Sequence, residues 1–338
     1  MRYMTLKNIK VGMRMAKPLI DENGNILLKE GNQLSSAVYN RIQKMDVQGL
    51  YVHDEISDGI EVEDLIRYNL KSDALKALLS KNIQRSIILA KEIVNDLKKS
   101  DSLQVNLIDV KNNKNFPQKH CVSVCIYSVI IGLAMKLNEE QLTNLAVAAM
   151  LHDIAKFDLP ESLLYKPAPL SPAEDKIMKQ LPKVSYEKLS LFTEISSQTR
   201  HAILMHHENE DGSGYPFGKK GNEIHLLAKI LHVANSFDSL ISPSFKTPIS
   251  IPEAVEYIMG ATGTIFNKEV VEAFVSKFAV YPVGTQVKLS NGEVGIVASN
   301  EHNSLRPVIR LLNEKLNYPF IDLSDNKQYL NVTILGIE

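Results

Sequence analysis

The sequence predicts a multidomain protein in which a central all-α helical bundle is flanked by a small N-terminal β-rich (α+β) module and a small C-terminal β-barrel or sheet. Residues 1–58 and 281–338 alternate apolar and polar side chains, the pattern of half-buried strands. Residues 105–280 instead carry apolar side chains at helical spacing. The chain has 338 residues, 44% of them hydrophobic, which is enough for two or three domains that each bury a core.

The N-terminal module, residues 1–58, contains the segment DENGN (Asp21–Asn25), in which an Asn-Gly pair lies between two apolar runs. Such a pair favours a tight turn between antiparallel strands, so we predict a β-hairpin here. A short helix is predicted near the segment SSAVYNRIQKM, residues 35–45. We expect this module to have an accessory or regulatory role.

Residues 59–104 form a predicted helical connector. Leucines recur at helical intervals among charged side chains, at positions 65, 70, 75, 78 and 79. An amphipathic segment of this kind either connects domains or pairs with a second copy, and on this basis we expect a homodimer.

The longest uncharged run is CVSVCIYSVIIGLAM, residues 121–135. It is shorter than the roughly 18 to 20 residues that a membrane helix needs, so we predict a buried helix. Cys121 and Cys125 lie one helical turn apart in this run, where we expect buried free thiols. Reactive thiols are the alternative.

The overall charge balance argues against partners that are recognised by a global field. Lys and Arg number 38 against 39 Asp and Glu, so we expect neither nucleic acid nor an anionic membrane as a partner. The N-terminal segment MRYMTLKNIKVGM has no apolar signal core, and we therefore expect a cytoplasmic location. Any phosphate binding must be local.

The C-terminal module, residues 281–338, contains a second Asn-Gly pair at positions 291 and 292. This pair predicts another hairpin. The segments VIRLL and YLNVTILGI have the composition of further strands.

The segment AAMLHDIAKFDLP, residues 148–160, brings polar residues into an apolar helical pattern. On a helix, Lys156 follows His152 by four residues and Asp153 by three, so the three side chains share one side. Imidazole and carboxylate suit divalent metal ions, a carboxylate can bridge two of them, and a lysine can offset phosphate charge. The alternative is a buried His-Asp ion pair with a flanking lysine.

The segment HHENEDGSGYP places His206 and His207 side by side. Neighbouring residues on a helix differ by about 100° in direction, so the two imidazoles could ligate two neighbouring ions. Gly212 and Gly214 then break the helix and let the backbone approach a ligand closely. An exposed helix end with ordinary turn chemistry is the alternative.

With these residues a family resemblance becomes specific. The segments HDIAKFDLPESLLYKP, HHENEDGSGYP and AKILHVANSFDSL, in this order and at this spacing, resemble the HD-GYP family, a branch of the HD phosphohydrolases. The resemblance covers residues 105–280, and the flanking modules resemble accessory domains found with such proteins.

The resemblance implies an HD-type helical bundle that holds two or three metal ions, usually iron or manganese, and hydrolyses the bacterial second messenger cyclic di-GMP to pGpG or GMP. A metal-bridging hydroxide would attack phosphorus while the ions hold the phosphate oxygens. The matched positions are the ligands His120, His152, Asp153, His206 and His207, the catalytic residues Asp153 and Lys156, and the substrate-binding residues Lys156, Gly214, Tyr215 and Pro216.

Two metal positions depart from the family pattern. Leu181 stands where the family usually has a histidine, and Asn235 stands where it usually has an aspartate ligand. Leucine supplies no donor atom, and asparagine keeps an oxygen but loses the negative charge. We therefore expect weaker metal binding, with Asn235 as a weak ligand. His232, three residues before Asn235, is either a compensating ligand or a packing or surface residue.

Two further positions differ from the family. Where a substrate-binding arginine is common, this chain has Pro243, Ser244 and Lys246. Phe116 cannot supply the carboxylate that members with a third metal have one turn before His120.

Two functions of different class follow from these residues. The first is a cyclic di-GMP phosphodiesterase with two divalent ions, its activity reduced by Leu181 and Asn235. The alternative is a non-catalytic relative that acts as a cyclic di-GMP sensor or as a protein-interaction module. GGDEF-type or other signalling proteins would bind through the GYP loop, the segment that contains Gly214, Tyr215 and Pro216.

Overall fold

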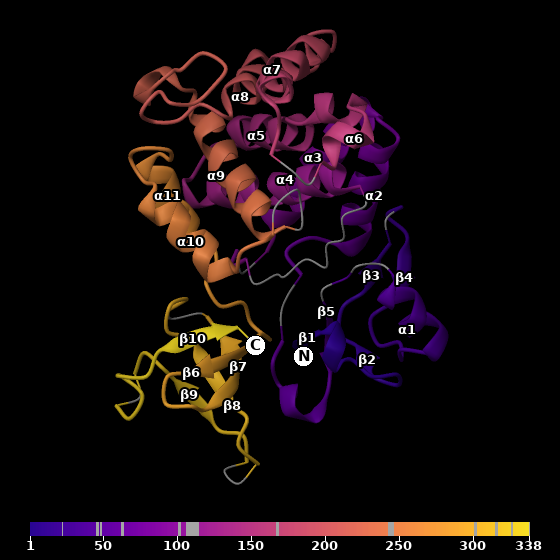
Figure 1. The fold of residues 1–338 in the computed structure, drawn as a ribbon, viewed down its shortest axis with the longest axis vertical. Coiled ribbons are helices and arrows are strands. Elements are labelled where there is room, and N and C mark those ends of the chain that lie inside the picture. Colours follow the sequence, from indigo (N-terminus) through magenta and orange to yellow (C-terminus); the bar gives the residue numbers. More distant parts are fainter. Residues whose placement is uncertain are drawn as a thin grey trace. The chain divides into compact units, whose positions relative to one another are not determined.

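In the computed structural model the chain divides into two compact units (Figure 1). The terminal unit comprises residues 1–64, 104–112 and 278–338, and the helical unit comprises residues 65–103 and 113–277. The residues that the structure describes are 1–21, 23–44, 47, 49–61, 64–100, 103–105, 115–166, 169–242, 247–300, 303–314, 317–325 and 327–337. The domain boundaries at residues 58, 104 and 280 stay a prediction.

The helical unit confirms that the central part of the chain is mostly helical. Helix α4 lies at its centre and packs against α2, α3, α5, α9 and α11. The helices are α2 (Tyr68–Leu79), α3 (Ile83–Leu97), α4 (Phe116–Ala134), α5 (Glu139–Leu151), η3 (Ile154–Asp158), α6 (Glu161–Leu164), α7 (Pro172–Leu189), α8 (Ser197–Met205), η4 (Gly221–Glu223), α9 (Leu226–Ile241), α10 (Ile251–Gly260) and α11 (Lys268–Val275).

Helix α4 contains the apolar run that was predicted to be a buried helix, and the structure confirms this prediction. Pro117 stands in the first turn, where its missing N–H costs nothing. Cys121 and Cys125 are buried free thiols, as predicted. Among the described helices, α4 alone is long and apolar enough to cross a membrane, and 83% of its most apolar window is buried inside the protein.

Helices α5 and α8 each end at a histidine that was predicted to ligate a metal ion. Asn138 caps the start of α5, where its side chain accepts a hydrogen bond from the Gln141 N–H, and Ser196 caps α8 in the same way. The residues that follow the last turns of α5 and α8 are His152 and His206. A helix C-terminus carries partial negative charge, so both helix ends favour a cation nearby.

The N-terminal part of the terminal unit contains the predicted strands and helix. A hairpin with the Asn23-Gly24 turn joins β3 to β4, as predicted, and α1 follows. The elements are β1 (Arg2–Thr5), η1 (Leu6–Asn8), β2 (Arg14–Met15), β3 (Leu19–Ile20), β4 (Ile26–Leu28), α1 (Ser36–Gln43), β5 (Gly49–His53) and η2 (Glu55–Ser57), with a sheet in the order β1-β5-β2.

The C-terminal strands form an open antiparallel sheet in the order β10-β6-β7-β8-β9. These strands are β6 (Gln286–Leu289), β7 (Val294–Ser299), β8 (Val308–Leu311), β9 (Phe320–Asp322) and β10 (Ile334–Ile337). The edge strands β9 and β10 do not pair within the described residues, so the β-barrel alternative is wrong and the sheet alternative is confirmed. Closure fails because both edges are short and β10 is irregular in register between Ile334 and Gly336.

The predicted C-terminal strand YLNVTILGI begins later than expected. Residues 329–333 lie outside any strand, and β10 starts at Ile334. The guanidinium of Arg306 donates hydrogen bonds to the carbonyl oxygens of Tyr329 and Leu330. These bonds hold the segment in a turn.

Gly295 in β7 provides a test of this sheet. A Cβ atom there would collide with the Ile309 side chain and lie 2.9 Å from the Arg310 carbonyl oxygen. We expect Gly295→Ala to lower the free energy of unfolding of the terminal unit by about 1–3 kcal/mol, the usual effect of overpacking. Gly336→Ala, on β10, has open space and should change it by less than about 0.5 kcal/mol. Urea denaturation measures both, and equal effects would contradict the packing of β7 on β8.

Candidate metal centre

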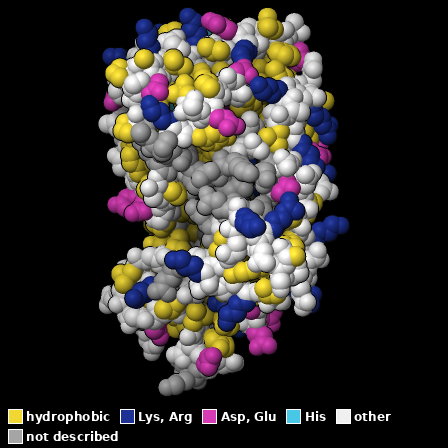
Figure 2. Space-filling model, turned by 45° about the vertical axis from the view of Figure 1, so that its right-hand side comes forward, with side chains coloured by type: hydrophobic (Ala, Val, Ile, Leu, Met, Phe, Trp, Pro, Cys, Tyr) yellow, Lys and Arg dark blue, Asp and Glu magenta, His cyan; other side chains and the backbone are white. Residues whose placement is uncertain are grey.

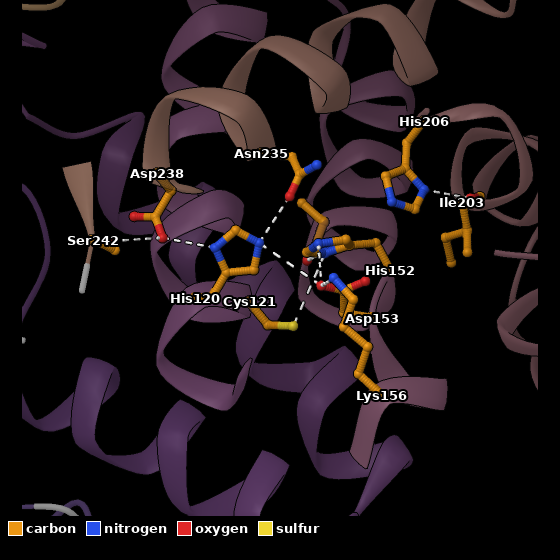
Figure 3. Close-up of polar contacts among 11 residues, drawn as sticks. His120, Cys121, His152, Asp153, Lys156, Ile203, His206, Asn235, Asp238 and Ser242 are labelled. Atoms are coloured by element: carbon orange, nitrogen blue, oxygen red, sulfur yellow. Dashed lines mark hydrogen bonds and ion pairs between the residues drawn. The ribbon is translucent and has the colours of Figure 1, made fainter. Parts of the chain in front are cut away.

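The candidate centre lies where four helices of the helical unit meet (Figure 3). The N-terminal part of α4 supplies His120, and the end of α5 supplies His152 and Asp153. His206 follows α8, and Asn235 lies on α9. All five side chains are buried, with at most 5% of their surface exposed.

His120 is held from both ring nitrogens. Its Nδ1 lies 2.7 Å from the Asp238 carboxylate, and its Nε2 lies 2.8 Å from the Asn235 side-chain oxygen. Burial lowers the pKa of His120, although Asp238 opposes this effect. The ring is therefore neutral, with its proton on Nδ1 facing Asp238 and its Nε2 lone pair directed toward Asn235 and Asp153.

Asn235 behaves differently from the aspartate that the family usually has there. Opposite a neutral His120, an amide can turn its NH₂ group toward Nε2 and donate a hydrogen bond, which an ionised carboxylate cannot do. The structure places the amide oxygen toward Nε2, the orientation in which Asn235 could ligate an ion, but an amide brings no negative charge to the site.

Asp153 lies among three groups that can carry positive charge. Its Oδ2 atom is 2.6 Å from the Lys156 Nζ, 3.2 Å from the His152 Nε2 and 3.8 Å from the His120 Nε2. Burial alone would raise the pKa of Asp153, but His152 and Lys156 hold it well below its ordinary value. The carboxylate is therefore ionised at neutral pH, as a metal ligand must be.

The donor atoms of His120, His152 and Asp153 all lie within 4.8 Å of one another. His152 is oriented by a 2.8 Å hydrogen bond from its Nδ1 to the Ala149 carbonyl oxygen, which leaves Nε2 facing Asp153. Burial opposes protonation of His152, but Asp153 and Cys121 raise its pKa to about 10. A metal ion would therefore have to displace a proton from this ring.

His206 gives the clearest sign that the site fits a cation. Its Nδ1 lies 2.6 Å from the Ile203 carbonyl oxygen and donates to it, and its ring is 5.0 Å from that of His152. The His206 Nε2 is buried and has no hydrogen-bond partner among the described residues. Burial lowers the pKa of His206 to about 3, helped by His152. A neutral imidazole with an unused, buried lone pair is the form that ligates metal.

His207 lies beside His206, with ring centroids 4.1 Å apart, and stacks on Tyr215 at 4.6 Å. Tyr215 follows Gly214 and is joined to Pro216 by a cis peptide bond. The predicted loop residues therefore lie against one of the two adjacent histidines. The GYP loop thus contacts the candidate ligand His207 through Tyr215.

Two of the positions that depart from the family pattern, Leu181 and Phe116, carry hydrocarbon side chains. Leu181 on α7 is buried one helical turn from Ser185, whose Oγ accepts a hydrogen bond from the Ala155 N–H. Phe116 stacks on the His120 ring at 5.4 Å. His232 is buried 5.0 Å from the Phe266 ring. The positions with Pro243, Ser244 and Lys246 lie outside the described residues.

Asp238 was not identified as a site residue from the sequence, although its helical spacing from Asn235 could have indicated it. It lies three residues after Asn235, on the same side of α9, and Ser242 donates a 3.3 Å hydrogen bond to it one turn further on. Glu208, also missed, stands directly after the two adjacent histidines and is buried. Its contacts are with backbone far along the loop, which no local pattern reveals.

A buried His-Asp pair and converging imidazoles on a helical bundle form a possible metal site. Residues 73–270 match the HD domain family, and the chain belongs to this family. The resemblance of its motifs to the HD-GYP branch is confirmed.

The chain is also similar in sequence to proteins named as cyclic di-GMP phosphodiesterases. The chain is 29% identical over 218 residues to a cyclic di-GMP phosphodiesterase of Pseudomonas aeruginosa, covering 64% of this chain and 52% of the relative. It is 39% identical over 159 residues to a cyclic di-GMP phosphodiesterase of Thermotoga maritima, covering 46% of this chain and 43% of the relative. The chain thus spans about half the length of these relatives.

One solved structure shares the fold. A protein of Bdellovibrio bacteriovorus, described as an HDG"Y"P protein, superposes with a TM-score of 0.51 at 15% sequence identity. The superposition covers 80% of this chain and 97% of the other. At this identity the likeness shows the fold alone.

Asp238 provides a test of the centre by metal affinity, which does not require a measurement of enzyme activity. If it orients His120 toward an ion, Asp238→Asn should weaken Mn²⁺ binding by roughly 10- to 100-fold, as changes behind a metal-ligating histidine usually do. Ser242→Ala, which removes the 3.3 Å hydrogen bond to Asp238 but keeps the carboxylate that faces His120, is the matched control and should have a smaller effect. Isothermal titration with Mn²⁺ measures both, and unchanged affinity in Asp238→Asn would contradict the assignment.

The buried neutral histidines predict a loss of stability in acid. Burial lowers the pKa of His232 to about 4, whereas the unfolded residue titrates near 6.5. Below pH 6.5 the unfolded chain takes up a proton that the folded chain does not, so stability that is present above pH 6.5 is lost as the pH falls toward 4. The loss should reach about 1.4 kcal/mol per pH unit for each such histidine.

Urea denaturation of chelator-treated protein between pH 7 and pH 4 measures this slope. His232→Gln should make it shallower, because glutamine does not titrate. A variant slope equal to that of the wild type would show that His232 is not held neutral by burial.

Proposed function

We propose that the chain is a metal-dependent phosphodiesterase that hydrolyses cyclic di-GMP to pGpG or GMP. The observation that carries the proposal is the buried cluster of His120, His152 and Asp153, with Lys156 beside it. Nearby, the His206 Nε2 finds no hydrogen-bond partner in the part of the chain that the structure describes. The names of the relatives supply the substrate. The HD domain family assignment supports the reaction class.

One divalent ion would be held by His120, His152 and Asp153, and a second by Asp153, His206 and His207. When bound, such ions supply Lewis acidity that polarises a phosphoryl group. Iron or manganese fits this set of imidazole and carboxylate donors.

The chain's own residues then position and neutralise the substrate. Asp238 keeps the His120 proton on Nδ1, so that Nε2 stays available. Lys156, whose side chain is 22% exposed, can leave Asp153 when an ion binds there and pair with a phosphate oxygen. Tyr215, stacked on His207, would form one wall for the nucleotide.

A second candidate function has a specific observation in its favour. Leu181 is buried and stands where the family usually has a histidine, so this position supplies no nitrogen ligand, and Asn235 adds no charge. A centre that binds ions weakly suits a protein that binds cyclic di-GMP, or a signalling partner through the GYP loop, without cleaving it. Hydrolysis and binding are separable by experiment.

The test uses protein loaded with Mn²⁺, its metal content by elemental analysis and its nucleotide products by chromatography. Wild type should release pGpG or GMP, and Asp153→Ala should lose both metal and turnover. The double variant Leu181→His, Asn235→Asp should bind metal more tightly and turn over faster by at least about tenfold, the effect that even outer-shell changes have. Cyclic di-GMP binding without products, in wild type and double variant alike, would refute hydrolysis and favour the sensor.

A further inference from the structure

Glu208 is a buried carboxylate outside the metal-ligand set. Only 2% of its surface is exposed. Its Oε1 accepts a 2.8 Å hydrogen bond from the Phe217 N–H, and its Oε2 accepts a 2.9 Å bond from the Lys219 N–H. An ionised carboxylate is costly to bury, and bonds to backbone N–H groups are among the interactions that make burial tolerable.

The two backbone N–H groups that Glu208 binds, of Phe217 and Lys219, lie in the part of the GYP loop that follows Pro216. The near end is fixed separately, because the N–H groups of Glu210 and Asp211 donate to the carbonyl oxygens of Ile265 and Thr264. Lys229 also forms a 2.9 Å ion pair with Glu210. Glu208 therefore supplies the side-chain attachment for Phe217 and Lys219, and the Gly221 N–H adds a 3.1 Å hydrogen bond to the Glu210 carbonyl oxygen further along the loop.

Between these two attachments the loop folds back onto the histidine segment. The Tyr215 N–H donates a 3.0 Å hydrogen bond to the His207 carbonyl oxygen. A Cβ atom on Gly214 would collide with the His207 oxygen and the Asn209 nitrogen, so only glycine permits this approach. The result is the stacking of Tyr215 on the His207 ring.

We propose that Glu208 is a positioning residue that holds the GYP loop closed against His207 and thereby fixes Tyr215 where the nucleotide binds. The part that concerns the nucleotide rests on the proposed function. Because Glu208 directly follows His206 and His207, one short stretch of backbone carries both the ligand candidates and the group that fastens the loop over them.

The variants are Glu208→Ala, which removes both acceptors, and Glu208→Gln, which keeps the shape and one acceptor oxygen. Glu223→Gln is the matched control. Glu223 is exposed in the same loop, and its carboxylate accepts a 3.2 Å hydrogen bond from the Lys220 N–H. The first measurement is limited trypsin digestion, with cleavage after Lys219 and Lys220 followed by mass spectrometry.

Loss of hydrogen bonds to a charged acceptor should speed cleavage at these two lysines by roughly tenfold in Glu208→Ala, and less in Glu208→Gln. The Mn²⁺ content should stay near that of wild type. In the hydrolysis assay the KM for cyclic di-GMP should rise by roughly tenfold with a smaller change in kcat, because the loop positions substrate and not the ions. Glu223→Gln, which changes only contacts that are exposed to water, should speed cleavage far less than Glu208→Ala and should leave the Mn²⁺ content and the KM unchanged.

Cleavage rates in both Glu208 variants equal to that of Glu223→Gln would overturn the proposal. A fall in kcat and metal content at unchanged KM would also overturn it, because Glu208 would then support the metal centre. Should Glu208→Ala not fold, Glu208→Gln decides. Failure of the proposed function would show instead as absent turnover in wild type, and the trypsin measurement would still test how the loop is held.

Discussion

The candidate centre depends on the carboxylate of Asp153 being buried next to positive charge. Lys156 compensates this charge at 2.6 Å, and His152 faces the same oxygen atom at 3.2 Å. Without a cation the carboxylate would be expensive to bury. Because the same oxygen is the natural ligand for an ion, Lys156 and a metal compete for it. The ammonium group compensates the buried carboxylate, and under the proposed function it would become free for a phosphate oxygen once an ion has bound.

Features that depend on local sequence were predictable. The apolar run in α4 and the two Asn-Gly hairpins follow from hydrophobic spacing and turn chemistry, and the structure contains all three. The barrel prediction failed because closure depends on whether the edge strands β9 and β10 pair, which is a long-range property. The late start of β10 likewise depends on Arg306, more than twenty residues earlier.

The positions of the site residues also divide into those that follow from local sequence and those that depend on long-range packing. His152, Asp153 and Lys156 lie within one short segment, so their proximity follows from helical spacing, whereas the approach of His120 to Asp153 depends on the packing of α4 against α5. The orientation of each imidazole was not predictable, because it is set by carbonyl groups of the preceding turn and by Asp238 from α9. Those contacts make Nε2 the atom that faces the site in all three rings.

The hydrogen bonds that the nearby carboxylates already form limit which of them can ligate an ion. Asp238 is bonded to His120, and Glu208 is bonded to loop backbone, so Asp153 is the carboxylate left to face an ion. A first divalent ion can replace Lys156 and the His152 proton as the positive charge beside Asp153. A second would share that carboxylate and add the neutral His206 and His207, with hydrocarbon at Leu181. The first ion should therefore bind more tightly than the second. Asn235 lies 2.8 Å from His120, a ligand of the first ion, so an added negative charge at Asn235 would strengthen the first site further.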